Sequence, residues 1–286
     1  MLNKSYRSEL IGLFGMPVDE NPTVIIMEAA FKELGLNYRY NTTMVKPKDL
    51  ETAVKALKAF NMKGTNITIP HKVEVLKYLD YVAEDAALMG AVNTVYLKNG
   101  KTYGENTDGK GFITSLREEN IELKGKKVVV LGAGGAARAA TVELAMAGAQ
   151  QIVVVNTNKD RGETLVKLLN DKTKVKARFV LWDKTFEVPN DTNIVVNATS
   201  IGLCPDTNKP NINYDTLTKD MIVCDVIPNP PQTPFLEEAE KRECRTFDGF
   251  SMLVNQGAIS FKLWTGEEAP IDVMRKALAK EFGRVL

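Results

Sequence analysis

One stretch decides the fold class of this chain: Lys126-Lys-Val-Val-Val-Leu131-Gly132-Ala-Gly134-Gly135-Ala-Ala137. It opens with a continuous apolar run rich in valine, which is typical of a strand buried on both faces of a sheet. Glycines follow at once, and a helical pattern then continues to residue 148. A second valine-rich run, Gln151–Asn156, predicts the next strand. This order of strand, tight turn, helix and strand predicts a parallel βαβ unit.

The glycine spacing Gly132-x-Gly134-x-x-Ala137 is typical of a loop that binds a dinucleotide. The first glycine allows the tight turn, the second lets the backbone approach a pyrophosphate, and the third small residue lets the helix pack closely on the strand. The helix N-terminus offers unpaired N–H groups to the phosphates. A turn that binds nothing could share these glycines, but the flanking strands and helix favour the dinucleotide loop. We expect five residues to contact the cofactor: Gly132, Ala133, Gly134, Gly135 and Ala136.

The end of the second strand, Asn156-Thr157-Asn158-Lys159-Asp160-Arg161, bears on the choice of cofactor. A carboxylate at the end of this strand would accept the ribose hydroxyls and favour NAD. No acid stands at position 156, and two nearby cations could pair with the extra phosphate of NADP. These cations could also be solvated charges at a helix start, and Asp160 keeps NAD open. The sequence favours NADP, with NAD as the alternative, and predicts four further contacts: Asn156, Thr157, Lys159 and Arg161.

Predicted strands and helices alternate along the whole chain, which predicts an α/β protein with mainly parallel sheets. Its 286 residues suggest about two domains. Further strands are expected at residues 10–14, 37–41, 64–69, 176–182, 193–197, 221–226 and 244–247. Helices are expected at residues 22–35, 47–60, 71–79, 249–265 and 270–283.

The composition is that of an ordinary globular protein, with 44% hydrophobic and 26% charged residues and a formal net charge of +1. This balance predicts neither a nucleic-acid partner nor attachment to a membrane. No signal peptide is evident at Met1–Arg7, and three widely spaced cysteines favour a reducing, cytoplasmic compartment. A single histidine without clustered cysteines argues against a metal site. The cysteines are Cys204, Cys224, expected in a buried strand, and Cys244.

Lys72 closes the run Asn66-Ile-Thr-Ile-Pro-His-Lys72. If this run is extended, its two isoleucines point into a core and its polar side chains share the opposite face: Asn66, Thr68 and Lys72. A face of amide, hydroxyl and amine suits a polar substrate, although a plain surface strand would share the pattern. The same alternation turns His71 away from Lys72, so we expect His71 to be structural or solvent-facing.

Oxidation of a secondary alcohol releases a hydride and a proton, and without a metal a side chain must accept the proton. Lys72 and Asp108, in the run Asn106-Thr-Asp-Gly109, are the best candidates. Because a free lysine has a pKa of about 10.4 and a carboxylate neighbour keeps it charged, the pair is better suited to donating a proton in carbonyl reduction. Lys72 could instead be a surface lysine, and Asp108 a cap of a helix at 109–118. Tyr103 is an alternative acid.

Seven runs resemble the shikimate and quinate dehydrogenase family, and they follow the family's order over nearly the whole chain. The runs are Asn66–Lys72, Gly90-Ala-Val-Asn-Thr94, Asn106–Gly109, Leu131–Ala137, Asn197-Ala-Thr-Ser200-Ile-Gly202, Thr233-Pro-Phe-Leu236 and Asp248-Gly249 through Gln256-Gly-Ala258. The tail Leu263-Trp-Thr-Gly266 is similar to the quinate/shikimate branch.

The resemblance implies a two-domain α/β enzyme with a cleft. Residues 1–107 with 249–286 would form an α/β substrate-binding domain, and residues 108–248 a Rossmann-type, doubly wound dinucleotide-binding domain. The implied activity is NAD(P)-dependent interconversion of a ring alcohol and its ketone, with shikimate and 3-dehydroshikimate as the default pair. Lys72 and Asp108 would be the catalytic pair. The expected partner is a small-molecule substrate, and the expected state is a monomer or a homodimer.

The resemblance also implies roles for residues other than the catalytic pair. Residues that would bind substrate hydroxyls or hold the catalytic pair are Asn66, Thr68, Asn93 and Gln256. Residues that would lie near the nicotinamide are Asn197, Thr199, Ser200, Gly249 and Met252.

Departures from the family pattern cluster where the substrate carboxylate would bind. The family has two serines in its opening motif, and Asn21 and Thr23 stand in their places. A family tyrosine that also reaches the carboxylate is Pro228 here, and Asp19 and Glu20 add negative charge nearby. Because Asn21 and Thr23 can still donate hydrogen bonds, we expect them to bind a substrate carboxylate more weakly or in another orientation.

Two alternatives therefore stay open beside the default function. The first keeps the hydride-transfer chemistry but acts on a different ring alcohol. The second is a non-catalytic, nucleotide-binding regulatory protein, against which the Lys72–Asp108 pair argues.

The family's second-strand Asn-Arg is Asn156-Thr157 here, so its usual arginine clamp on the NADP phosphate is absent.

Overall fold

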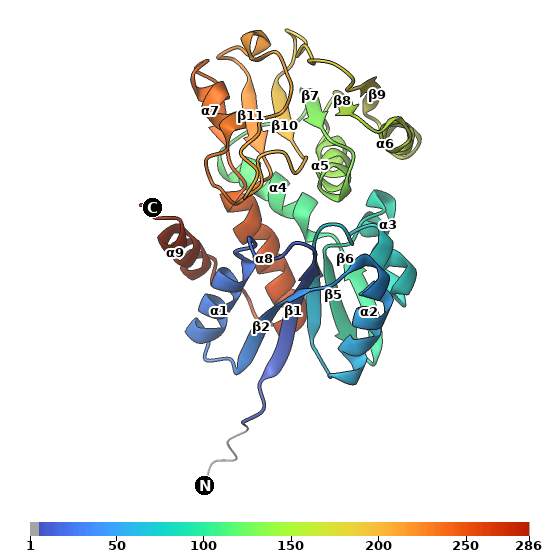
Figure 1. Cartoon of the computed structure of the whole chain (residues 1–286), viewed down its shortest axis with the longest axis vertical. Helices are drawn as coiled ribbons and strands as arrows, with labels where there is room; N and C mark the ends of the chain where they lie inside the picture. The colour runs from blue at the N-terminus through green and yellow to red at the C-terminus, as the bar shows by residue number, and fades with distance from the viewer. Residues whose placement is uncertain (1–5, 286) are drawn as a thin grey trace. The chain divides into compact units, whose positions relative to one another are not determined.

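The computed structural model describes residues 6–285 of the chain (Figure 1). Most of the segment on which the signal-peptide expectation rests, residues 1–5, lies outside this range. The chain divides into two compact units. Unit 1 comprises Met1–Thr107 and Val254–Leu286, and unit 2 comprises Asp108–Leu253.

The sheet of unit 1 has the strand order β2-β1-β3-β5-β6-β4. The first three strands are parallel, whereas β5 runs antiparallel to both β3 and β6. Because β4 pairs parallel with β6, five of the six strands run in one direction, and the expected mainly parallel sheet is confirmed with β5 as the exception. A type I′-like turn at Asn99-Gly100, with φ of 53° and 72°, makes the β5–β6 hairpin. The bounds are β1 Glu9–Gly15, β2 Tyr38–Met44, β3 Gly64–Ile67, β4 Tyr81–Val82, β5 Thr94–Lys98 and β6 Lys101–Glu105.

Helices cover both faces of the unit 1 sheet. On one face, Phe31 of α1 stacks on Phe261 of α8 with ring centroids 5.6 Å apart. A Cβ at Gly257 of α8 would lie 2.7 Å from Ile26, so glycine lets α8 approach α1. The other face buries a cluster that includes Leu57 and Val75. The bounds are α1 Thr23–Glu33, α2 Leu50–Ala59, α3 Glu84–Met89, α8 Phe250–Thr265 and α9 Ile271–Glu281, with 3₁₀ turns at Pro47–Asp49 and Glu74–Tyr78.

The sheet of unit 2 is parallel throughout, with the order β12-β11-β10-β7-β8-β9. Each strand predicted in this half is confirmed within two residues. The chain runs from the central β7 outward through β8 and β9, and then fills the other side, which makes the sheet doubly wound. The bounds are β7 Lys127–Leu131, β8 Gln151–Asn156, β9 Lys176–Leu181, β10 Ile194–Asn197, β11 Ile222–Asp225 and β12 Arg245–Phe247.

Helices α5 and α6 pack on one face of the unit 2 sheet (Figure 1), and the opposite face buries a cluster around Phe235 of α7. Cys224 lies buried in β11, as expected, and all three cysteines are free. Among residues 6–285, no helix is long and apolar enough to cross a membrane. The bounds are α4 Thr107–Glu118, α5 Gly135–Met146, α6 Lys159–Lys172 and α7 Pro234–Glu240.

The expectation that residues 66–72 are extended is wrong beyond Ile67, where β3 ends. A turn follows, because Pro70 has no N–H with which to continue a strand ladder. Ile67 is buried as expected, but Ile69 is 44% exposed. The positions of Thr68, His71 and Lys72 therefore depend on this turn and not on strand alternation.

Candidate active site

The predicted substrate residues of unit 1 follow strands that end at one edge of its sheet. Strands β1, β3 and β6 share a direction, so their carboxyl ends meet at this edge. Asn21 and Thr23 follow β1, and Thr68 and Lys72 follow β3. Asn93 directly precedes β5, which starts at the same edge because it runs the opposite way. In α/β sheets the carboxyl ends of strands are the usual place for a ligand.

Backbone contacts hold the loops after β1 and β3 together. The N–H of Met16 donates to the carbonyl of Ile69 at 2.8 Å, and the N–H of Thr68 donates to the carbonyl of Phe14 at 2.9 Å. A Cβ at Gly15 would lie 2.1 Å from the Thr68 methyl group, so only glycine lets these loops come this close. The loop that leads to Asn21 is thus fixed against the turn that carries Lys72.

The Lys72 turn is anchored by its neighbour His71. The imidazole is fully buried, and its Nε2 lies 2.7 Å from the carbonyl oxygen of Val45. Because a carbonyl only accepts, Nε2 carries the hydrogen of this bond. The carbonyl of Lys72 in turn accepts the N–H of Val92 at 2.8 Å. The structural role expected for His71 is confirmed, and the solvent-facing alternative is wrong.

Asn93 is the centre of a buried polar network. Its Oδ1 accepts the backbone N–H of Thr107 at 2.7 Å. Its Nδ2 donates to the Thr107 hydroxyl at 2.9 Å and to Oε1 of Gln256 at 3.3 Å. Asp108 follows Thr107 directly in the chain and is 7% exposed. The network therefore fixes the residue that leads into Asp108.

Asn66 belongs to the same network. Its Oδ1 accepts the Tyr40 hydroxyl at 2.6 Å, and its Nδ2 donates to the Asn93 carbonyl and to the Thr94 hydroxyl, both at 3.1 Å. Burial raises the pKa of the Tyr40 phenol well above its ordinary value, so it remains a donor. Four members of this network were not predicted from the sequence: Tyr40, Thr94, Thr107 and Ser260. Ser260 could have been predicted from its spacing, because it lies four residues after Gln256 and so on the same face of a helix.

Asn21 and Thr23 bind each other at the start of α1. The Asn21 Oδ1 accepts both the backbone N–H of Thr23, at 3.0 Å, and its hydroxyl, at 2.6 Å. Thr23 is 3% exposed, and Asn21 is half-buried. The hydroxyl hydrogen of Thr23 is thus used within the pair.

The dinucleotide loop of unit 2 lies where the strand order reverses, between β7 and β10. Gly132 has φ of 109°, and a Cβ there would lie 2.8 Å from the carbonyl oxygen of Ala198, after β10. A Cβ at Gly134, in contrast, would meet no atom within 4 Å. The exposed Gly134 backbone thus leaves open space that a pyrophosphate fits, at the N-terminus of α5. Ala133 is buried, and Gly135 and Ala136 are half-buried.

The cations expected near the cofactor phosphate lie in the first turn of α6. Asn158 caps this helix by accepting the Arg161 N–H at 3.0 Å. Lys159 is exposed and lies 3.8 Å from the carboxylate of Glu163. Burial, and then the charge of Arg161, lowers the pKa of the Arg138 guanidinium, which places these two cations near each other. The sequence missed Arg138, although its place in the first turn of α5 was a usable signal.

The other predicted cofactor contacts of this strand, Asn156 and Thr157, differ in exposure. Asn156 is half-buried, and its Nδ2 donates to the Asn158 carbonyl at 2.8 Å. Thr157 is exposed.

A buried carboxylate supports the loop after β10. The Thr199 hydroxyl donates to Oδ1 of Asn197 at 2.7 Å, and Nδ2 of Asn197 donates to Oδ2 of Asp225 at 3.1 Å. Thr233 and the backbone of Ile227 also donate to this carboxylate. Burial outweighs these bonds and raises the pKa of Asp225 to about 6.

The remaining predicted residues differ in their surroundings. A Cβ at Gly249 would lie 2.6 Å from the carbonyl of Ile227, so glycine is required there. Met252 is buried, whereas Ser200 is exposed. Tyr103, the alternative acid, packs its ring between Tyr81 and Tyr96.

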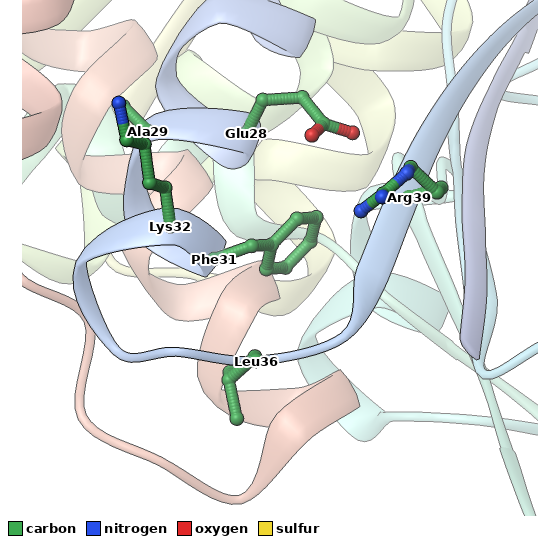
Figure 2. Close-up of a pocket in the computed structure, with 6 residues that line it drawn as sticks. All are labelled: Glu28, Ala29, Phe31, Lys32, Leu36 and Arg39. Carbon is green, nitrogen blue, oxygen red and sulfur yellow. The ribbon is translucent and has the colours of Figure 1, made fainter. Parts of the chain in front are cut away.

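A pocket of about 490 Å³ lies elsewhere on unit 1 (Figure 2). None of the predicted site residues lines it. Arg39, one of its lining residues, lies at the amino end of β2. Lys72 follows the carboxyl end of β3, at the opposite edge of the same sheet. The lining residues are Glu28, Ala29, Phe31, Lys32, Leu36 and Arg39.

Three family models match the chain. They are the shikimate dehydrogenase substrate binding domain at residues 13–95, the shikimate / quinate 5-dehydrogenase model at 115–226 and the shikimate 5'-dehydrogenase C-terminal domain at 249–279. A shikimate dehydrogenase (NADP(+)) of Methanopyrus kandleri is 46% identical over 279 residues, which cover 96% of each chain. The chain belongs to the shikimate dehydrogenase family.

Two solved structures extend the comparison of this shikimate dehydrogenase family member. A shikimate dehydrogenase in complex with NADP⁺ is 40% identical, with a TM-score of 0.88 and 96% coverage of both chains. A 5-ketofructose reductase of Gluconobacter sp. strain CHM43 is 47% identical, with a TM-score of 0.87 and coverage of 97% of this chain and 100% of that one. Membership confirms the expected family, the two-domain α/β fold class with a Rossmann-type half, and an NAD(P)-dependent oxidoreductase that acts on a CH–OH group.

Proposed function

We propose that this protein catalyses the reversible, NADP-dependent reduction of a polyhydroxylated ketone, with 3-dehydroshikimate and shikimate as the first substrate pair. The observation that carries the proposal is the Asn93–Thr107 contact, which fixes the residue before Asp108. Thr107 follows β6 at the sheet edge where Lys72 follows β3. The Methanopyrus kandleri relative, a shikimate dehydrogenase (NADP(+)), supports both the substrate and the cofactor.

Lys72 and Asp108 are the proposed acid–base pair. NADPH, when bound, supplies the hydride for the carbonyl carbon. The ammonium group of Lys72 donates a proton to the carbonyl oxygen as negative charge develops there. Asp108 accepts a hydrogen bond from the ammonium group and orients it. In the reverse direction the neutral amine of Lys72 accepts the alcohol proton, and Asp108 orients it.

The proposed roles of the two units follow from these placements. Unit 2 binds the cofactor through residues 132–136 and the start of α6, where Lys159 and Arg161 take the phosphate of NADP. Thr199, Gly249 and Met252 are proposed nicotinamide contacts. Unit 1 binds the substrate through six residues: Asn21, Thr23, Asn66, Thr68, Asn93 and Gln256.

We further propose that the protein acts in the cytoplasm as a monomer or a homodimer. Three free cysteines, one of them the exposed Cys204, favour a reducing compartment. Size-exclusion chromatography with light scattering measures the oligomeric state, and a larger assembly would contradict the proposal.

A second substrate class is a neutral polyhydroxylated ketone. Two observations favour it: the relative named as a 5-ketofructose reductase at 47% identity, and the Asn21–Thr23 pair in place of two serines. The relatives are named as enzymes, which does not favour the non-catalytic alternative.

A spectrophotometric panel tests the proposed function. Purified protein is supplied with NADPH or NADH and with 3-dehydroshikimate or 5-ketofructose, and the reverse reaction is run with shikimate and quinate. We expect turnover of at least one ketone, with higher kcat/KM for NADPH than for NADH. Absence of turnover with every pair, in protein that binds NADPH, would contradict the proposed function.

A further inference from the structure

We propose that the Asn21–Thr23 pair determines substrate class: it selects a neutral hydroxyl group on the substrate over a carboxylate, and so admits polyhydroxylated ketones without a carboxylate. The inference rests on the proposed function, because it concerns the same substrate site at the edge of the unit 1 sheet. It goes further by stating which chemical group this pair binds.

The hydrogen bonds within the pair decide what it can offer to a ligand. The Oδ1 of Asn21 must be the acceptor, because it receives the backbone N–H of Thr23 at 3.0 Å. The same oxygen takes the hydroxyl hydrogen of Thr23 at 2.6 Å. Two groups remain for a ligand: the Nδ2 amide of Asn21, which only donates, and the lone pairs of the Thr23 oxygen, which only accept.

One donor beside one acceptor suits a hydroxyl group, which can accept from Asn21 and donate to Thr23 at once. A carboxylate carries no hydrogen to donate, so the lone pairs of Thr23 would face its negative charge. Two serines would instead offer two rotatable hydroxyl donors. Conversion of the pair to serines would therefore change one acceptor into a donor.

Charge along the same segment points the same way. The loop between β1 and α1, residues 16–22, contains two acids and neither lysine nor arginine. Asp19 and Glu20 directly precede Asn21, and Asp19 is exposed. An anionic group bound at Asn21 would meet these carboxylates without a cation from the segment, whereas a neutral hydroxyl group would be indifferent to them.

Position supports a role in the site for this pair. The loop that carries it is bonded to the Lys72 turn through Met16 and Ile69, at 2.8 Å. The 2.6 Å bond to the Asn21 Oδ1 sets the direction of the Thr23 hydroxyl before a ligand binds. A fixed donor–acceptor pattern discriminates between ligands more strongly than a pair of freely rotating hydroxyls.

Kinetics of one double variant test the inference. We expect wild-type protein to reduce 5-ketofructose with a kcat/KM at least equal to that for 3-dehydroshikimate, both with NADPH. In each reduction the carbonyl carbon gains the hydride and its oxygen gains the proton from Lys72. Asn21→Ser/Thr23→Ser should move the ratio of the two kcat/KM values toward 3-dehydroshikimate by roughly 10- to 100-fold, the range of one hydrogen bond to a charged group.

The chain offers a matched control at Asn41 and Thr43, an exposed Asn-x-Thr on the edge strand β2. Asn41→Ser/Thr43→Ser should leave the ratio unchanged. Reduction of 3-dehydroshikimate alone by wild type, or a ratio that the Asn21/Thr23 variant does not move, would overturn the inference and leave the proposed function standing. Turnover of neither ketone would overturn the proposed function itself.

A second measurement uses wild-type protein only and holds if the double variant does not fold. Oxidation of shikimate is compared with oxidation of its methyl ester, which removes the negative charge. We expect the two kcat/KM values to agree within about threefold, since the pair gains little from the charge. A loss of more than about tenfold on esterification would show that the site recognises the carboxylate and would overturn the inference.

Discussion

The Oδ1 of Asn93 lies 2.7 Å from the backbone nitrogen of Thr107, the residue directly before Asp108. This bond joins the residue before β5 to the first residue of α4, and it holds the chain at the point where it leaves unit 1. Gln256 and Ser260 of α8 complete the network from a distant part of the sequence, at 3.3 Å and 3.1 Å from the Thr107 hydroxyl. The position of Asp108 thus depends on a network that no single segment contains.

Asn93→Ala should lower kcat with little change in the KM for NADPH. The substitution leaves the Thr107 N–H without its acceptor, at a cost of about 1–3 kcal/mol in the free energy of unfolding. We expect kcat to fall by about 100-fold, because a displaced Asp108 no longer orients Lys72. Steady-state kinetics with chemical denaturation measure both quantities. An Asn93→Ala protein with full kcat would exclude this network from the chemistry.

His71 should act on the reaction only through the position of Lys72. His71→Leu removes the bond to the Val45 carbonyl, and we expect kcat to fall by about 10- to 100-fold while NADPH binding is kept. His71→Gln can again place an N–H near this carbonyl and should recover much of the loss. The pair of variants separates the hydrogen bond from the volume of the ring: equal defects in both would argue that ring packing, and not the bond, positions Lys72.

Arg138 and Arg161 should set the preference for NADPH. Arg161→Ala and Arg138→Ala should each raise the KM for NADPH by roughly tenfold or more, because each removes a charge-assisted contact to phosphate. The KM for NADH, which lacks that phosphate, should stay the same. Arg178→Ala, at an exposed site on β9, is the control. A parallel rise for both cofactors would show that the arginines support the fold and not phosphate binding.

Asp225 should make unit 2 less stable as the pH rises. Its folded pKa, about 6, lies above its ordinary value of 3.8, so the folded state holds the proton more tightly than the unfolded state. The free energy of unfolding therefore falls as the pH rises from about 4 to about 6, by up to about 3 kcal/mol. Asp225→Asn should lack this dependence.

Unfolding of unit 2 can be followed alone, because each unit holds one tryptophan: Trp264 in unit 1 and Trp182 in unit 2. In a Trp264→Phe background, the fluorescence of Trp182 reports urea unfolding of unit 2 over a pH series. The free energy of unfolding is measured with Asp225 intact and with the Asp225→Asn substitution. We expect the free energy of unfolding with Asp225 intact, minus that of the Asp225→Asn variant, to fall as the pH rises. A difference that stays constant or increases with pH would contradict the raised pKa of Asp225.

The strands of unit 2 were predicted well, because the information that specifies them is local. Strands such as Gln151–Asn156 are buried on both faces, so their sequences are nearly continuous apolar runs that can be recognised without knowledge of the rest of the fold. Glycine is required at position 132 because φ is positive there and because a Cβ would lie too close to the loop that follows β10. Unit 1 was predicted less well: Pro70 ends the alternation expected after Ile67, and the β5–β6 hairpin was missed although Asn99-Gly100 is a strong turn signal.

The candidate site divides in the same way. Lys72, Asp108 and Asn93 stand in short recognisable runs, whereas their supports do not. Tyr40 and Ser260 meet Asn66 and Thr94 only because four elements that are distant in the sequence pack together. The hydrogen bond between Asn21 and Thr23 also could not be predicted from the sequence. The sequence shows that both residues are potential donors, but not that the Thr23 hydroxyl hydrogen is donated to Asn21.

The most direct test of the central claim is the turnover of Lys72→Ala with NADPH and whichever ketone the wild-type protein reduces best. We expect kcat to fall by at least about 1000-fold, since the proton donor is lost, while the dissociation constant for NADPH, measured by fluorescence, stays within about twofold. Lys72→Arg keeps the charge but not the ammonium geometry, and should be nearly as impaired. A Lys72→Ala protein that binds NADPH and keeps wild-type kcat would contradict the assignment of Lys72 as the proton donor.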